Sequence, residues 1–316
     1  MGIVIGLILI LAVSLLVLVT GLFLFTHNTV RRAEMASPAK GTFVDLTDVR
    51  LHSLDAGSGS PILLIHGLSS QLGSFNCGVI DRLAEKFRVI AVDRPGSGYS
   101  ARHPKALATL DAQADALAEL IGKLNLEKTM VVGHSLGGAV ALALAIRHPD
   151  KVSGLCLIAP LTHMPEVVPP AFKALMIASP HMRAAIAWTF AVPAMIVRRQ
   201  ETLGLLFGPE KVTREYTTKG GALLNLRPSQ FIASSADLYA IPANLSTLEN
   251  RYTEIEIPVE ILFGRGDQIL NPVSNGKIFT EKVSTANLTL VDGGHMLPVT
   301  QAELTADFIK SFADRL

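Results

Sequence analysis

A serine flanked by glycines is the part of this sequence best suited to covalent chemistry. Gly133, Ser135 and Gly137 form the pattern G-x-S-x-G between an apolar run, 130–132, and an alanine-rich stretch, 139–147. This arrangement predicts a buried strand, a sharp turn and a helix. The turn would hold the serine hydroxyl at the carboxyl end of the strand, facing the free N–H groups that begin the helix. We therefore predict that Ser135 is a nucleophile and not an incidental serine in a tight glycine turn.

A serine hydroxyl becomes a good nucleophile when a base, normally histidine, takes its proton. The chain has nine histidines. We expect His295 to be the base, because it follows an apolar strand pattern, 288–291, in a glycine-containing loop. His66 also follows a strand pattern, but we expect it to be a structural hydrogen-bonding group beneath the site. His134 adjoins the nucleophile and is expected to point elsewhere on the turn.

The base needs a carboxylate to orient it, and this acid should also leave the end of a strand. Asp267 follows the strand pattern 260–264 and precedes His295, which matches the order Ser, Asp, His for this type of turn. Asp292 is a rival, but it is more typical of a local turn. Asp237 lies outside the strand patterns and is expected to be solvated or to cap a helix.

Acyl transfer also needs two N–H groups to stabilise the negatively charged oxygen of the intermediate. The backbone N–H of Leu136, directly after the nucleophile, is expected to be one. The other should come from the loop that follows the strand pattern 61–65. There we assign the N–H of Leu68, which follows His66 and Gly67.

The elements that would position these groups alternate along residues 42–316. Short apolar runs alternate with helical patterns, which predicts a mostly parallel sheet with helices on both faces. Residues 160–257 interrupt the alternation with proline-containing helical stretches, so we expect a helical cap inserted after a strand. The apolar runs are 61–65, 88–92, 128–132, 152–159, 259–263 and 287–291.

The expected cap is rich in methionine and aromatic residues. These side chains are either ordinary helix packing or the lining of a pocket for an apolar acyl or alcohol group. The residues are Met164, Phe172, Met176, Met182, Trp188, Phe190, Met195, Leu205, Leu206 and Phe207.

The N-terminus carries a 23-residue run without a charge, from Ile3 to Phe25. A helix of that length can cross a hydrocarbon core of about 30 Å. A cleaved signal peptide would have basic residues before the run and a small-residue cleavage site after it, and neither occurs. A core helix of the globular domain would be amphipathic, whereas this run is apolar all round. We therefore expect residues 1–26 to be a retained single-pass anchor and residues 27–41 to be a linker.

Basic residues flank only the C-terminal end of this run. They are Arg31, Arg32 and Lys40. The positive-inside rule then favours a cytoplasmic location for the domain that follows.

Composition argues against several other functions. The net charge of +1 gives no indication of nucleic-acid binding. The two cysteines, Cys77 and Cys156, form no C-x-x-C pair, and no cluster of possible ligands has the spacing of a metal site. No G-x-G-x-x-G follows a strand pattern. We expect no metal and no cofactor.

Five motifs occur in a fixed order along residues 42–316: His66-Gly67, the segment from Asp93 to Ser100, the segment from Gly133 to Gly138, the segment from Gly264 to Asp267, and Gly293-Gly294-His295. In this order the chain resembles the α/β-hydrolases, in particular the capped esterases and lipases. It is similar to monoacylglycerol-type lipases and small carboxylesterases. The resemblance implies an α/β-hydrolase fold with a helical cap.

We therefore expect a membrane-anchored serine hydrolase that cleaves carboxylic esters of apolar substrates through an acyl-enzyme. Within such a family the same triad also serves acyl transfer, C–C bond hydrolysis and cofactor-free perhydrolysis, so these stay open. Epoxide and haloalkane hydrolysis use a carboxylate at the turn, and Ser135 argues against them. A non-catalytic, membrane-tethered binding module is a further alternative, which the full set of Ser135, Asp267 and His295 disfavours.

Overall fold

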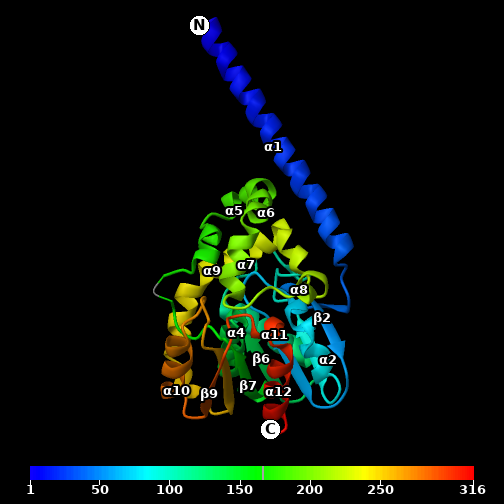
Figure 1. Ribbon diagram of the computed structural model, residues 1–316, viewed down its shortest axis with the longest axis vertical. Coiled ribbons are helices and arrows are strands. Elements are labelled where there is room, and N and C mark those ends of the chain that lie inside the picture. Colours follow the sequence, from blue (N-terminus) through cyan, green and yellow to red (C-terminus); the bar gives the residue numbers. More distant parts are fainter. Residues whose placement is uncertain (166) are drawn as a thin grey trace.

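A nine-stranded sheet forms the centre of the computed structural model, which describes residues 1–165 and 167–316 (Figure 1). Its strands follow the order β1-β2-β4-β3-β6-β7-β8-β9, and β5 pairs with β2. From β4 to β9 in this order all pairs are parallel, and the antiparallel pairs are the three that β2 makes with β1, β4 and β5. The predicted mostly parallel sheet is confirmed. The strands are β1 (Thr42–Asp45), β2 (Val49–Ala56), β3 (Pro61–Ile65), β4 (Arg88–Val92), β5 (Ala101–Arg102), β6 (Thr129–His134), β7 (Val152–Ile158), β8 (Val259–Gly264) and β9 (Ala286–Val291).

Helices cover both faces of the sheet, which explains why its central strands are continuous apolar runs. Along β3, Leu63 and Ile65 pack on the face of α3 and α4, whereas Ile62 and Leu64 pack on the face of α2 and α12. Side chains on a strand alternate between faces, so each run contributes to both cores. The helices outside the cap are η1 (Leu72–Cys77), α2 (Val79–Leu83), α3 (Leu110–Lys123), α4 (Leu136–Arg147), η2 (Pro149–Lys151), η7 (Val273–Lys277), α10 (Ile278–Lys282), α11 (Leu297–Thr300) and α12 (Ala302–Ala313).

The cap lies between β7 and β8 and consists of helices in the part that the structure describes. Helices α5 and α6 form its outermost tip, beside the N-terminal helix (Figure 1). The cap covers the carboxyl ends of the strands, because its residues Phe172 and Leu206 line the same cavity as Ser135, which directly follows β6. Its helices are η3 (Pro170–Leu175), α5 (Pro180–Ile186), η4 (Ala187–Ala191), α6 (Val192–Val197), α7 (Arg199–Phe207), α8 (Arg214–Thr218), η5 (Ala222–Leu226), α9 (Pro228–Glu249) and η6 (Tyr252–Glu254).

The N-terminal helix α1 (Gly2–Ala36) is long and apolar enough to cross a membrane. It continues past the predicted end of the anchor, so a non-helical connection starts only at Ser37. The helix is almost fully exposed up to residue 21. From there to Ala36 a stripe at helical spacing is covered, and the helix packs on η4, α6 and η5. The covered residues are Leu22, Thr26, Thr29, Val30, Ala33 and Glu34.

Polar contacts also tie the end of α1 and the segment after it to the domain. The Glu34 carboxylate lies 2.9 Å from the Arg227 guanidinium. The hydroxyl of Tyr99 donates to the carbonyl of Ser37 at 2.6 Å. The last turns of α1 are therefore part of the folded domain.

This docking predicts different effects for two truncations. Removing residues 1–21 should leave the free energy of unfolding unchanged, because almost all of these residues are exposed. Removing residues 1–39 should lower it by roughly 2–4 kcal/mol, because a hydrogen bond and the covered stripe are lost. Urea unfolding of both chains in the same mild detergent, followed by circular dichroism, measures the difference. Equal stabilities would contradict the docking.

Candidate active site

Ser135 lies at the sharp turn between β6 and α4, as the sequence predicts. Its backbone φ is 54°, in the left-handed region that residues other than glycine rarely adopt. The turn requires glycine on both sides. A Cβ on Gly133 would lie 2.5 Å from the carbonyl oxygen of Gly137, and one on Gly137 would lie 2.2 Å from that of Ile65. The strand, the turn and the helix thus pack too closely for any larger residue.

Ser135, His295 and Asp267 form one hydrogen-bonded chain. The Nε2 atom of His295 lies 3.0 Å from the Ser135 Oγ, and its Nδ1 atom lies 2.7 Å from a carboxylate oxygen of Asp267. The other oxygen of Asp267 accepts from the backbone N–H groups of Ile269 and Leu270 at 2.8 and 3.0 Å. The carboxylate therefore accepts the Nδ1 proton of the ring and leaves Nε2 free to take the serine proton.

The two rival acids lie elsewhere. The Asp292 side chain is fully exposed, and its nearest charged partner is Arg265 at 3.7 Å. Asp237, on α9, is buried between Arg94 and Arg102 at 2.7 and 2.6 Å. The expectation that Asp237 is solvated or caps a helix is therefore wrong. The two arginines lie more than 130 positions away in the sequence, so no local pattern could indicate that they pair with Asp237.

The two expected N–H donors lie beside Ser135. Leu136 is the first residue of α4, and Leu68 lines the same small cavity as Ser135. This cavity has about 20 Å³ of free space, room for roughly one water molecule. Its lining is Gly67, Leu68, Ser69, Ser70, His134, Ser135, Phe172, Leu206, Tyr216, His295 and Met296.

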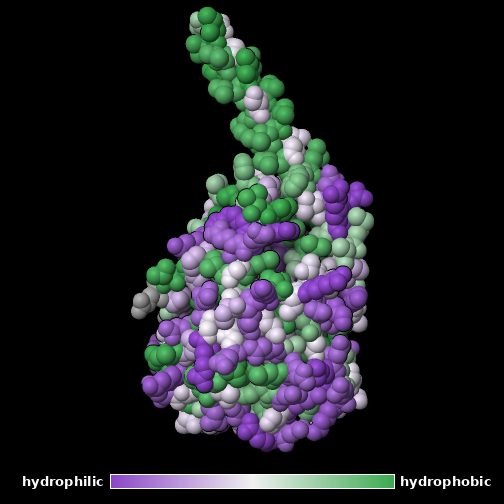
Figure 2. All heavy atoms as spheres, in the orientation of Figure 1, coloured by the Kyte–Doolittle hydropathy of each residue, from purple (hydrophilic) through white to green (hydrophobic). Residues whose placement is uncertain are grey.

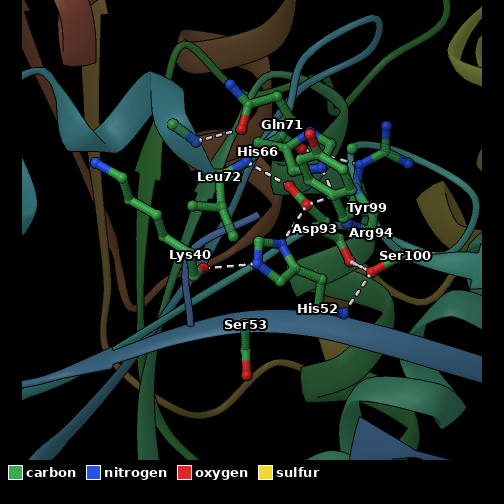
Figure 3. Close-up of polar contacts among 12 residues, drawn as sticks. Lys40, His52, Ser53, His66, Gln71, Leu72, Asp93, Arg94, Tyr99 and Ser100 are labelled. Atoms are coloured by element: carbon green, nitrogen blue, oxygen red, sulfur yellow. Dashed lines mark hydrogen bonds and ion pairs between the residues drawn. The ribbon is translucent and has the colours of Figure 1, made fainter. Parts of the chain in front are cut away.

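His66 and Arg94, both labelled in Figure 3, form hydrogen bonds with backbone groups next to Leu68. Burial, together with the charge of Arg94, keeps the pKa of His66 well below its ordinary value. The neutral ring accepts the backbone N–H of Arg94 at 2.9 Å and donates to the carbonyl of Gly67 at 2.8 Å. The Arg94 guanidinium donates to the carbonyls of His66 and Gly67 at 3.0 and 3.1 Å. The predicted structural role of His66 is confirmed.

Asp93 directly follows β4, and its carboxylate holds the neighbouring loops by hydrogen bonds (Figure 3). Its carboxylate accepts from the N–H groups of Leu72 and Tyr99, both at 2.8 Å, and from His52 Nδ1 at 2.7 Å. The other ring nitrogen of His52 donates to the carbonyl of Lys40 at 2.6 Å. Burial alone would lower the pKa of His52, but the Asp93 carboxylate and the Lys40 carbonyl raise it above its ordinary value.

His134 does not point away from the site. Its ring lines the cavity, lies 5.0 Å from the ring of His295 and donates from Nε2 to the His295 carbonyl at 3.0 Å. Burial lowers the pKa of His134 to about 3, so the ring is neutral. With the proton on Nε2, Nδ1 is an acceptor that faces Gly67. His134 thus supports the backbone of the residue expected to be the base.

Glu210, between α7 and α8 of the cap, supports the same loop and was missed by the sequence analysis. Its carboxylate accepts from the backbone N–H of Gly294 and from the amide of Gln301, both at 2.8 Å. No spacing in the sequence connects it with His295. The cap therefore contacts both loops of the site, through Asp237 on one side and Glu210 on the other.

The cap residues for which the sequence left helix packing and pocket lining open take different roles, and Met195 and Phe207 pack in hydrophobic clusters. Phe172 and Leu206 line the cavity beside Ser135, together with Tyr216. Met164, Met176, Met182 and Phe190 are exposed instead, and Trp188 contacts α1. Among the described residues, no group of His, Cys, Asp and Glu could hold a metal ion.

Comparisons with known proteins agree with this fold. A family model described as alpha/beta hydrolase fold matches residues 60–302. A 2-hydroxymuconate semialdehyde hydrolase from Pseudomonas sp. is 37% identical over 128 residues, which are 40% of this chain and 45% of that protein. A thermophilic esterase from Thermogutta terrifontis superposes with a TM-score of 0.69 at 23% identity, covering 87% of this chain and 99% of that one. A membrane phospholipase A superposes with a TM-score of 0.67 at 23% identity, over 99% and 98% of the chains.

The His52–Asp93 pair predicts a pH-dependent stability. Because the pKa of His52 is raised in the folded state above about 6.5, its extra stabilisation is fully present below that pH and is lost as pH rises through the folded pKa. The free energy of unfolding should therefore exceed that of His52→Gln most at about pH 5.5 and least at about pH 9. Urea titrations of both chains measure this difference, from which other titrating groups cancel. A difference that stays constant with pH would contradict the charged pair.

The position of Asp267 predicts the effect of removing its charge. Asp267→Asn should lower the rate of any reaction that needs the Ser135–His295 pair by about 10⁴, because the ring is no longer held in the required tautomer. Asp292→Asn, which removes an exposed carboxylate three residues from His295, is the matched control and should keep the full rate. Reaction with a fluorophosphonate gives both rates. If the Asp292 variant were the crippled one, the acid would be misassigned.

Proposed function

The chain belongs to the alpha/beta hydrolase fold family, and from that premise we propose that it is a serine hydrolase acting on carboxylic esters of apolar substrates. The observation that carries the proposal is the chain of hydrogen bonds from Ser135 through His295 to Asp267 beside an apolar cavity. The esterase among the structural neighbours supports it.

The proposed reaction passes through an acyl-enzyme. The Ser135 oxygen attacks the ester carbonyl while His295 Nε2 takes its proton, and the N–H groups of Leu68 and Leu136 stabilise the resulting oxyanion. Collapse of the intermediate breaks the ester C–O bond, and His295 returns the proton to the departing alcohol. Water then attacks the acyl group with His295 again as base, which releases the acid and regenerates Ser135. Asp267 orients the ring throughout.

We propose that α1 is a retained membrane anchor through residues 3–25. The length and apolar character of α1 support this, and so does the likeness to a membrane phospholipase A over nearly the whole chain. Arg31 and Arg32 follow the apolar run, so the positive-inside rule favours a cytoplasmic side for the catalytic domain. An apolar ester dissolved in a bilayer would then lie close to the site.

Hydrolysis of a C–C bond is the second candidate. The similarity to a 2-hydroxymuconate semialdehyde hydrolase over 128 residues favours it. Such a substrate carries polar groups that need buried polar partners, whereas Phe172 and Leu206 on the cap side of this cavity are apolar. Ester hydrolysis fits these walls better. Comparing turnover of apolar esters with that of a 2-hydroxy-6-oxo-dienoate discriminates the two candidates.

The proposal predicts that full-length protein hydrolyses p-nitrophenyl esters and is labelled by a fluorophosphonate. Ser135→Ala should abolish both while leaving the circular dichroism spectrum unchanged, because the alanine removes only the nucleophile. Ser284→Ala, at an exposed position, is the control and should behave as the parent chain. A series from acetate to palmitate reports the preferred acyl length. Normal turnover by the Ser135 variant would overturn the assignment.

A further inference from the structure

The uncovered part of α1 has the length of a hydrocarbon core. From Ile3 to Gly21 almost every residue is exposed, and at about 1.5 Å per residue this stretch is about 28 Å long. A bilayer core is about 30 Å thick. If this exposed part of the proposed anchor, residues 3–25, fills the core, the edge of the hydrocarbon lies near Leu22, where the covered part of the helix begins.

The tip of the cap lies at that same level. Helix α1 packs on η4 and α6, and the ring of Phe23 lies 5.3 Å from the ring of Trp188 on η4. Trp188 is the only tryptophan of the chain. Tryptophan is enriched at the interface between the hydrocarbon and water, because its ring is amphipathic.

Apolar side chains of the tip are exposed beside α1. Met182 on α5 is 57% exposed, Phe190 on η4 is 54% exposed and Val197 on α6 is 83% exposed. Figure 2 shows hydrophobic surface at this end of the cap, next to the base of α1, and hydrophilic surface below it. Arg198 and Arg199 follow Val197 at exposed positions. The Arg198 guanidinium pairs with the Glu201 carboxylate at 2.9 Å, so Arg199 is the cation that can meet lipid phosphate groups.

The end of α1 cannot swivel freely against the cap. Glu34 is paired with Arg227, and the Arg227 guanidinium also lies 4.8 Å from the centre of the Tyr99 ring. Tyr99 in turn holds the carbonyl of Ser37. These contacts fix the direction in which α1 leaves the domain, so an inserted α1 also fixes which face of the cap meets the bilayer.

We propose that the tip of the cap, formed by α5, η4 and α6, is immersed in the headgroup region of the bilayer that α1 crosses. The inference rests on the proposed membrane anchoring and adds a second, monotopic contact to it. The exposed apolar side chains of the tip enter the lipid, and Arg199 stays at the level of the phosphates. The cap that forms the walls of the cavity then lies directly against the source of apolar substrate.

Two valine positions test the immersion. Full-length chains carrying Val197→Cys or Val273→Cys are labelled with the fluorophore NBD and reconstituted into phosphatidylcholine and phosphatidylglycerol vesicles. Val273 is 57% exposed on η7, outside the cap, and is the matched control. The native thiols compete poorly, because Cys156 is buried and burial raises the pKa of Cys77 to about 11.

At position 197 we expect blue-shifted emission and loss of fluorescence with brominated lipids, and at position 273 emission typical of water and no loss. Water-like emission at both positions would overturn the immersion. So would a blue shift at position 197 that bromine does not quench and that grows with the protein-to-lipid ratio, because a second copy of the chain would then cover the tip.

Flotation and ester assays on the same vesicles separate this inference from the proposed function. Protein that floats and hydrolyses a soluble ester, yet has a water-exposed position 197, would overturn only the immersion. Protein that does not float would overturn both the anchor and the immersion. Protein that floats and is immersed without hydrolysing any ester would support the immersion and overturn the esterase.

A charge at the tip provides the functional counterpart. Phe190→Glu should lower turnover of a long-chain ester dissolved in vesicles severalfold, because a carboxylate opposes entry into lipid, while turnover of p-nitrophenyl acetate stays unchanged. Leu304→Glu on α12, outside the cap, is the matched control and should change neither rate. Equal rates for both variants on the vesicle substrate would argue against the immersed tip.

Discussion

The rest of the site depends on the ion pairs that the buried Asp237 carboxylate makes with two arginines. It lies between Arg94 and Arg102, and Arg94 in turn donates to the backbone carbonyls beneath Leu68. Removing one member of a buried ion pair costs about 3–5 kcal/mol, because the remaining charge stays in a medium of low polarity. The cap and the loop beside Ser135 are therefore joined by a buried ion pair. Removing either Asp237 or Arg94 would disturb the cap and the loop together.

The cap is consequently part of the site and not a cover laid over it. Asp237 on α9 is joined to the loop that carries Leu68, and Glu210 binds the loop that carries His295. Any movement of the cap large enough to admit a substrate into so small a cavity acts on both loops at once. This arrangement couples opening of the site to the geometry of the groups around Ser135.

Most of the sheet and the juxtaposition of Ser135, His295 and Asp267 could be predicted, because each of these features has a local sequence pattern. A buried parallel strand is a short apolar run, and the turn at Ser135 requires glycines at fixed positions that can be read directly. Glu210 and Asp237 could not be predicted in the same way. They act on backbone groups or on arginines far away in the chain, and an isolated carboxylate in a helical segment is indistinguishable from a solvated one until the fold brings its partners close.

The end of α1 shows the same limit in a different form. Residues 27–36 are polar enough to suggest a linker, yet they continue the helix and pack on the cap. The covered positions Thr26, Thr29 and Ala33 are small, which lets two helices approach closely, and this property has no hydropathy signal. The small side chains on this face, together with the Glu34–Arg227 pair, thus distinguish a helix end docked on its domain from a flexible linker. For the proposed membrane anchor, that difference decides whether a membrane only concentrates the protein or also orients its cap.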